Sequence, residues 1–170
     1  MLERFTERAR RVIVGATGQA RSLRHEFVAP EHVLLSLILD SGGMGTHVLQ
    51  RLVLDVASLK AEVERTLLAM TPRASPGEPA FDADLRRVFA LAVETAGELR
   101  HPCIGTEDLL LGLLKAGQSN AARILKDHGA SLAEAQREVP ILIGAPAPAT
   151  SDTLRLIRAS KWLIKLRRGA

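Results

Sequence analysis

The chain contains an internal repeat with an offset of 76 residues and no gap, and this repeat constrains the fold more than any other feature. Aligning Phe5 with Phe81 carries one half of the chain onto the other. The matched segments are Arg10-Arg11-Val12 with Arg86-Arg87-Val88, Leu23-Arg24-His25 with Leu99-Arg100-His101, Glu31 with Glu107, Leu34-Leu35 with Leu110-Leu111, and Glu62-Val63 with Glu138-Val139. Such a period is typical of one helical unit used twice, each copy covering the apolar face of the other.

Composition favours an all-α protein with one core. Of its 170 residues, 46% are hydrophobic and only 3% aromatic, and the abundant Leu, Ala, Arg and Glu lose little rotamer freedom in a helix. The single cysteine, Cys103, excludes an internal disulfide and suits a reducing compartment; we interpret it as a small buried residue. The charged N-terminus is unlike a signal peptide, and no apolar stretch approaches the roughly 20 residues that span a bilayer. We therefore expect a cytoplasmic protein.

Each copy is predicted to form four helices. The first is capped by Thr6 or Asp82 and runs to about Leu23 or Leu99, and a turn through His25 or His101, with a structural or capping role, leads to the second. The second helix is expected to open at Glu31 in copy one and at Glu107 in copy two. The third is expected over Thr46–Leu52 and Ala121–His128, and the fourth over Val56–Leu68 and Leu132 to about Val139. The predicted organisation is a double repeat over 1–141 (repeat one 1–70, linker 71–80, repeat two 81–141), a Pro/Ala linker over 142–150 and a tail over 151–170.

Several strings in this register resemble the N-terminal repeat domain of Clp unfoldases of the ClpC/ClpA type. In copy two they are Phe81-x4-Arg86-Arg87-Val88 and His101-Pro-Cys-Ile-Gly-Thr-Glu-Asp-Leu-Leu-Leu-Gly-Leu113. In copy one they are Glu3-Arg4-Phe5-Thr6-Glu7-Arg8-Ala9-Arg10-Arg11-Val12 and His25-Glu-Phe-Val-Ala-Pro-Glu-His-Val-Leu-Leu-Ser-Leu37. The resemblance covers about residues 1–141 and implies two tandem, pseudo-twofold four-helix repeats.

The chain departs from that family in lacking the loop Gly-x4-Gly-Lys-Ser/Thr, whose backbone amides cradle phosphates in the ATPase modules. We interpret it as a stand-alone copy of the repeat domain. Its serines lack a nucleophile-elbow context, and its histidines lack a metal-ligand spacing such as His-Glu-x-x-His. We therefore expect no enzymatic activity, no metal and no cofactor.

Paired acids open the second helix of each copy. In proteins that the chain resembles, the equivalent glutamates hold the guanidinium of phosphoarginine on marked client proteins; this implies a ligand site at Glu31, Glu107 and Thr106. A carboxylate accepts a forked guanidinium, and a helix start attracts an anion. Copy one carries Pro30 where copy two has Thr106, so it lacks that hydroxyl and a backbone donor. In the alternative, both glutamates only stabilise helix N-termini.

The tail is unlike the family. Residues 151–170 carry six basic groups and one acid, so the net charge of +4 for the whole chain leaves −1 on residues 1–150. The spacing predicts a basic amphipathic helix that packs on the body, docks on a protein partner, or lies on an anionic membrane or nucleic acid. Its candidate contact residues are Arg155, Arg158, Lys161, Trp162, Lys165 and Arg168.

From the resemblance we predict a non-catalytic recognition, adaptor or regulatory module of a Clp-type AAA+ proteolytic system. Its partners would be an AAA+ unfoldase or protease subunit, client proteins, or both. The alternative is an interaction protein independent of Clp that uses its basic tail on nucleic acid or an anionic membrane surface.

Overall fold

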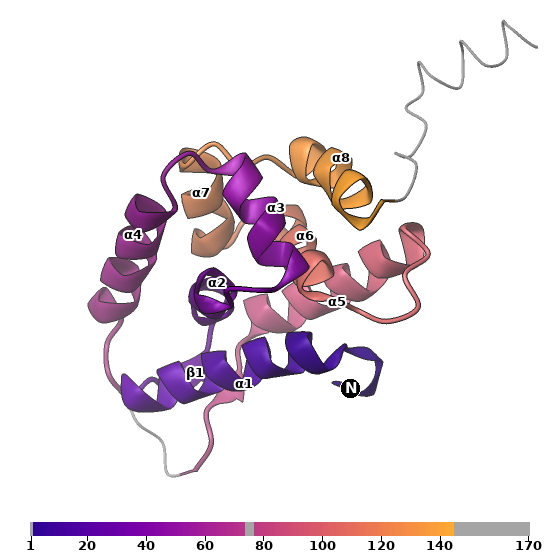
Figure 1. Cartoon of the computed structure of the whole chain (residues 1–170). Helices are drawn as coiled ribbons and strands as arrows, with labels where there is room; N and C mark the ends of the chain where they lie inside the picture. Colours follow the sequence, from indigo (N-terminus) through magenta and orange to yellow (C-terminus); the bar gives the residue numbers. More distant parts are fainter. Residues whose placement is uncertain (1, 74–76, 145–170) are drawn as a thin grey trace, which may run out of the picture.

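The computed structural model of the chain describes residues 2–73 and 77–144 (Figure 1). These residues form eight α-helices, one short 3-10 helix and two short strands. In chain order they are the 3-10 helix Leu2–Arg4, α1 (Glu7–Ser22), β1 (Phe27–Val28), α2 (Pro30–Leu39), α3 (Met44–Leu52), α4 (Val56–Ala69), β2 (Ala80–Phe81), α5 (Ala83–Glu98), α6 (Thr106–Ala116), α7 (Asn120–Asp127) and α8 (Leu132–Ile143).

The helices confirm the all-α fold built from a duplicated four-helix unit. Each helix from α5 to α8 begins 76 residues after its counterpart from α1 to α4. The starting pairs are Glu7 and Ala83, Pro30 and Thr106, Met44 and Asn120, and Val56 and Leu132. The repeat in the sequence is therefore a repeat of helix starts.

Equivalent local interactions set the ends of the first helix in each copy. The Thr6 hydroxyl accepts a hydrogen bond from the Ala9 N–H at 3.2 Å, and the Asp82 carboxylate accepts one from the Leu85 N–H at 2.6 Å. Beyond the C-terminal ends, Arg24 and Arg100 have φ of 56° and 58°. This left-handed conformation closes both helices and turns the chain toward the second helix.

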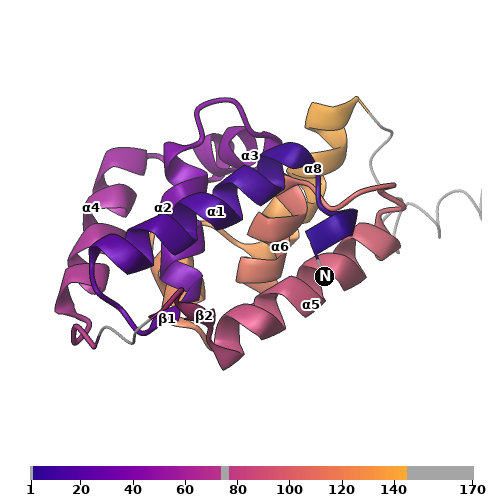
Figure 2. The ribbon, with the colours of Figure 1, turned by 90° about the horizontal axis from the view of Figure 1, so that it is seen from below.

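The two copies interlock at the segments that precede their helices. β1 pairs in parallel with β2, with Val28 opposite Phe81, near the start of α5 (Figure 2). The equivalent pairing joins Phe5 to Ile104, where the Thr6 N–H donates to the Ile104 carbonyl at 2.9 Å. Each copy therefore pairs the segment before its first helix with the turn before the second helix of the other copy.

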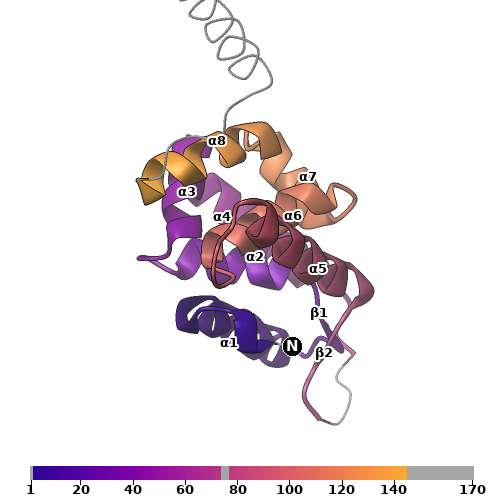
Figure 3. The same ribbon diagram turned by 90° about the vertical axis from the view of Figure 1, so that its right-hand side faces the viewer.

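The core is shared between the copies. In Figure 1, α2 is seen nearly end-on at the centre, with α1, α3, α4 and α7 around it, and its residues Pro30–Leu37 are all buried. α3 packs on α6 and α8 of the second copy, and α4 packs on α7 as well as on α2. Figure 3 shows α1 on the opposite side of the molecule from α7 and α8. Each copy thus covers the apolar face of the other, as the repeat predicted.

Some expectations were wrong in detail. Cys103 is exposed rather than buried, because it lies in the turn before α6. α8 continues through Pro140 to Ile143, past the predicted end at about Val139 and into the predicted linker 142–150. Residues 145–150 of that linker and the tail lie outside the described residues, so the predictions for them stay predictions; they include the tail residues Arg155, Arg158, Lys161, Trp162, Lys165 and Arg168. Within residues 2–73 and 77–144, no helix has the length and apolar character that a membrane crossing requires.

Candidate functional site

Each copy begins its second helix with a polar network that ties the helix start to the preceding turn. In copy two, the Asp108 carboxylate accepts the Gly105 N–H at 2.8 Å through one oxygen and contacts His101 Nδ1 at 2.8 Å through the other. In copy one, His32 Nδ1 accepts the Ala29 N–H at 3.0 Å, and His32 Nε2 lies 2.9 Å from His25 Nδ1. These bonds confirm the structural role predicted for His25 and His101.

Burial sets the protonation of these networks. Burial and, to a smaller extent, the neighbouring His25 together lower the pKa of His32 to about 4, so the ring is neutral near pH 7. Because Nδ1 of the neutral ring accepts the Ala29 N–H, its proton resides on Nε2, which donates to His25 Nδ1. In copy two, burial raises the pKa of Asp108 to about 6.

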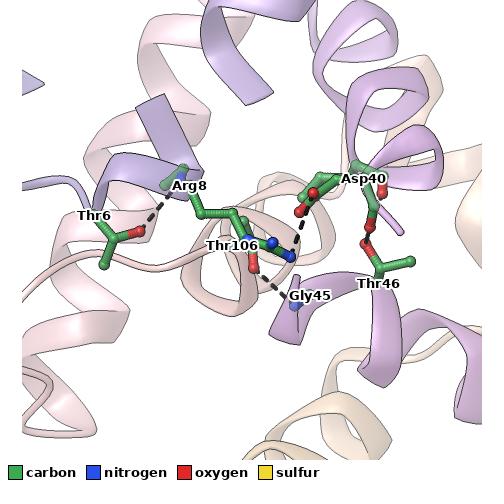
Figure 4. Close-up of polar contacts among 8 residues, drawn as sticks. Thr6, Arg8, Asp40, Gly45, Thr46 and Thr106 are labelled. Carbon is green, nitrogen blue, oxygen red and sulfur yellow. Dashed lines mark hydrogen bonds and ion pairs between the residues drawn. The ribbon is translucent and has the colours of Figure 1, made fainter. Parts of the chain in front are cut away.

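The start of each second helix also meets the start of the third helix of the other copy. At the start of α6, Thr106 is 2% exposed, and its hydroxyl accepts the N–H of Gly45 in α3 at 3.0 Å (Figure 4). At the start of α2, the carboxylate of Glu31 is buried close to the N–H of Ala121 at the start of α7. Gly45 and Ala121 are equivalent positions in the repeat. The duplicated fold therefore creates two crossing points between the copies.

Glu31 is enclosed at its crossing point. Its side chain is 5% exposed, and burial raises its pKa. The nearby carboxylates of Asp82 and Asp84 also raise it, whereas the N–H groups of Glu31 and Ala121 lower it. Burial raises the pKa of Asp82 as well. Two acids of the second copy thus lie near the buried glutamate of the first.

Glu107 differs from Glu31 in both exposure and bonding. It is half-buried, and its carboxylate folds back over Gly105, where an added Cβ would meet Glu107 Oε1 at 2.2 Å. Within residues 2–73 and 77–144, this carboxylate makes no hydrogen bond or ion pair. His101, Glu107 and Asp108 offer ligand atoms within 4.8 Å of one another, a grouping able to hold a metal ion. Both Asp108 oxygens are already hydrogen-bonded, however, so a metal would have to replace those contacts.

A basic residue lies near the place where the starts of α3 and α6 meet. The guanidinium of Arg8 in α1 lies 3.6 Å from Asp40 Oδ1 (Figure 4). Arg8 Nη1 and Asp40 Oδ2 are buried without a hydrogen-bond partner in the part of the chain that the structure describes. The Gly42-Gly43 loop permits this arrangement, since a Cβ on Gly42 would approach Arg8 Nη1 to 2.4 Å. Arg8 thus places a positive charge at the Gly42-Gly43 loop, which precedes α3.

Sequence reasoning found the paired glutamates but not the groups around them. His32, Asp108, Arg8 and Asp40 were not singled out, because their partners are supplied by turns and by the other copy. The repeat register offered one signal, since residues 32 and 108 are equivalent polar positions. Whether Glu31, Glu107 and Thr106 contact a ligand stays a prediction.

The arrangement defines an all-α domain made by internal duplication, with polar helix starts crossing between the copies. The family model of the Clp repeat (R) N-terminal domain matches residues 4–128, and the chain belongs to this family.

Curated relatives agree with this assignment. The chain is 35% identical over 164 residues to the chaperone protein ClpC, chloroplastic, of Pisum sativum, which covers 91% of this chain and 17% of that relative. The chain therefore spans about a sixth of the length of this relative.

Solved structures share the fold. The N-terminal domain of ClpD from Arabidopsis thaliana has a TM-score of 0.63 and 25% identity, covering 85% of this chain and 97% of that domain. A ClpV N-domain solved in complex with a VipB peptide has a TM-score of 0.66 and 17% identity, covering 86% of this chain and 92% of that one.

Proposed function

We propose that this chain is a non-catalytic recognition module of a Clp-type AAA+ proteolytic system, which binds client or adaptor proteins and holds phosphoarginine at Glu107. Membership of the Clp repeat family and the ClpV N-domain solved with a VipB peptide support the general part of this proposal. The half-buried carboxylate of Glu107, which makes no hydrogen bond or ion pair within the described residues, supports the specific part. Its Clp-type partner would be an AAA+ unfoldase or a protease subunit.

The groups around the start of α6 match both ends of phosphoarginine. A carboxylate accepts the guanidinium through charged hydrogen bonds, and Glu107 has no competing partner among the described residues. The phosphate needs positive potential, which the Arg8 guanidinium and the start of α3 supply. A phosphate would compete with Asp40 for Arg8, and their separation of 3.6 Å indicates a loose pair that such an anion can displace.

Binding of an arginine-phosphorylated peptide tests the ligand. Glu107→Ala should weaken binding by about 1.5–3 kcal/mol, the usual cost of losing a hydrogen-bond partner of a charged group. Glu31→Ala should weaken it less, because Glu31 is buried against α7. Isothermal titration calorimetry measures both, with the exposed acid Asp127→Ala as the control. Equal losses for the two glutamates, or no loss for either, would instead support a purely helix-stabilising role.

Capture from native lysate tests the system to which the chain belongs. The tagged full-length chain should recover a Clp ATPase or protease subunit. Recovery of nucleic acid or lipid without either subunit would contradict the proposal and favour an interaction protein that acts through the basic tail.

A further inference from the structure

A hollow lies between α1, α2 and α4 of the first copy. α1 and α4 both pack on α2 (Figure 1), and the space left between them has a volume of about 580 Å³. Its lining is mostly apolar: Leu23 follows α1, Leu35 lies in α2, and Leu67 and Leu68 lie in α4. Leu68 is 73% exposed. An apolar hollow with an exposed leucine in its wall is typical of a surface that another molecule covers.

Two glycines of α1 keep this hollow open. A Cβ on Gly18 would meet no other atom within 4 Å, so a larger side chain would project into the space. A Cβ on Gly15 would lie 2.9 Å from Ser36 Oγ, so a larger residue there would press against α2. Gly15, Gly18 and Ser22 are spaced by three and four residues and therefore share one face of α1. This face lets the backbone of another helix approach closely.

The equivalent face in copy two is filled by side chains. The positions of α5 that correspond to those three residues are Leu91, Glu94 and Glu98. Lys115 of α6 bridges the two glutamates, with Nζ 3.0 Å from Glu94 Oε1 and 3.1 Å from Glu98 Oε1. At Gly112, α6 also lies directly on the backbone of α5. The open face therefore belongs to copy one, where the sequence omits these side chains.

The hollow continues toward the N-terminal end of α1, where its charge changes. This second part shares Gln19 with the apolar part and is also lined by Arg8, Arg11 and Asp40. Asp40 offsets the charge of Arg8, whereas the exposed Arg11 makes no ion pair within residues 2–73 and 77–144. The charged residue of the apolar part is Glu64. A ligand with acidic groups at one end therefore complements the end at Arg11.

The lining also determines the form of the ligand. From residue 8 to residue 22, α1 rises about 21 Å, the length of a helix of about 14 residues. α1, α2 and α4 use their backbone groups in their own helical hydrogen bonds, so an extended segment would find no strand edge to pair with. An amphipathic helix satisfies its own backbone and presents one apolar stripe.

We propose that α1, α2 and α4 of copy one form a docking groove for an amphipathic helix of a partner protein, with the acidic end of that helix at Arg11. The residues that line the groove all belong to copy one, so the groove is a surface separate from Glu107. The proposal goes beyond the proposed function and does not depend on phosphoarginine.

Designed peptides test the groove on the full-length chain. They are end-capped helical peptides of about 14 residues, with apolar residues (leucine, isoleucine or phenylalanine) at i, i+3, i+4 and i+7 and glutamates in the first turn. Fluorescence anisotropy measures the dissociation constants, and amide chemical shifts locate the contact. We expect binding with shifts at Gly15, Gly18 and the leucines of the groove. Failure of every striped peptide to bind, or equal binding of scrambled peptides of the same composition, would overturn the proposal.

Filling the groove tests the apolar contact. Gly18→Leu should weaken binding about tenfold or more, because its side chain occupies the space that the helix needs. Gly97→Leu in α5 is the matched control, since a Cβ there also meets no atom within 4 Å, and it should bind within about twofold of the unmodified chain. Thermal unfolding checks that both variants fold. Equal losses in the two variants would contradict the proposed location.

A charge exchange tests the orientation of the helix. Arg11→Glu should weaken binding of the acidic peptides roughly threefold to tenfold, and lysines in place of their glutamates should recover it. Arg10→Glu, at an exposed position of α1 outside the groove lining, is the control and should change neither. If Arg11→Glu does not distinguish acidic from basic peptides, the assigned orientation is wrong.

The same measurements identify other occupants. Peptide binding that requires truncation after Thr150 would show that the chain's own tail fills the groove, and a dimer that Gly18→Leu dissociates would show that a second copy does. Either result would overturn the proposal of a partner helix. Gly18→Leu should leave phosphoarginine binding unchanged. If the unmodified chain binds no phosphoarginine but Gly18→Leu still weakens peptide binding, the proposed ligand at Glu107 is wrong while the groove stands.

Discussion

At the scale of single residues, His32 and Asp108 show how one structural task is done with two chemistries. Both are fully buried at equivalent positions, and both accept the N–H of the residue before their helix while contacting a turn histidine. Burial penalises the charged form of each, so it lowers the pKa of His32 to about 4 and raises that of Asp108 to about 6. The two residues therefore give stability opposite dependences on pH.

The sign of the His32 effect can be tested. Between about pH 6.5 and 4 the unfolded chain protonates this histidine and the folded chain does not, so stability falls as the pH falls through this window. Asp108 acts in the opposite sense, because the folded state holds its proton up to about pH 6. His32→Asn keeps an acceptor for Ala29 and removes the titration. The variant should gain about 1–3 kcal/mol relative to the unmodified chain between pH 7 and 4.5.

Urea unfolding at the two pH values measures this gain. His47→Asn, at an exposed histidine of α3, is the matched control and should show no such gain. A stability difference for His32→Asn that is the same at both pH values would contradict the prediction.

At the scale of elements, the sequence predicted the helices well because their signals are local. Thr6 and Asp82 cap the first helix of each copy. The constant offset of 76 residues then gives every helix start of copy two from its counterpart in copy one. The strands were missed because two-residue elements such as Phe27–Val28 show no alternating pattern, and their partners lie in the other copy. The predicted end of α8 was too early, because the helix continues through Pro140, a residue type that is unfavourable inside helices.

Close packing between α5 and α6 depends on a glycine. A Cβ on Gly112 would lie 2.7 Å from the Val88 carbonyl oxygen and 3.0 Å from the Ala92 nitrogen, both of which are backbone atoms of α5. Gly112→Ala should therefore destabilise the fold by about 1–3 kcal/mol, as overpacking of a core does. Gly18→Ala, in α1, is the matched control, because the added Cβ meets no other atom within 4 Å. This variant should stabilise the fold by about 0.5–1 kcal/mol, since alanine favours the helix over glycine. Chemical denaturation of both variants measures the difference, and a destabilisation of the same size in each would contradict the packing argument.

At the scale of the whole molecule, the candidate site is a product of the interlocked copies. Gly45 and Thr106 come from different copies, as do Glu31 and Ala121. The resemblance drew attention to the glutamates, but it could not show which of them the fold uses for itself, because that depends on contacts between residues far apart in the sequence. The asymmetry of the two copies thus becomes visible only once the helices are packed.

The tail prediction also belongs to this scale, because charge is distributed unevenly along the chain. Residues 151–170 carry six basic groups and one acid, whereas residues 1–150 have a net charge of −1. Association driven by charge should depend on this segment and weaken with salt, as the Debye length falls from about 10 Å at 0.1 M to about 3 Å at 1 M.

Truncation after Thr150 should abolish salt-sensitive binding to a protein partner, an anionic surface or nucleic acid. The helical repeats should stay folded, since their core is formed within residues 2–144. Thermal unfolding and binding assays at the two salt concentrations measure these outcomes, and a much lower Tm of the truncated chain would show that the tail packs on the body instead.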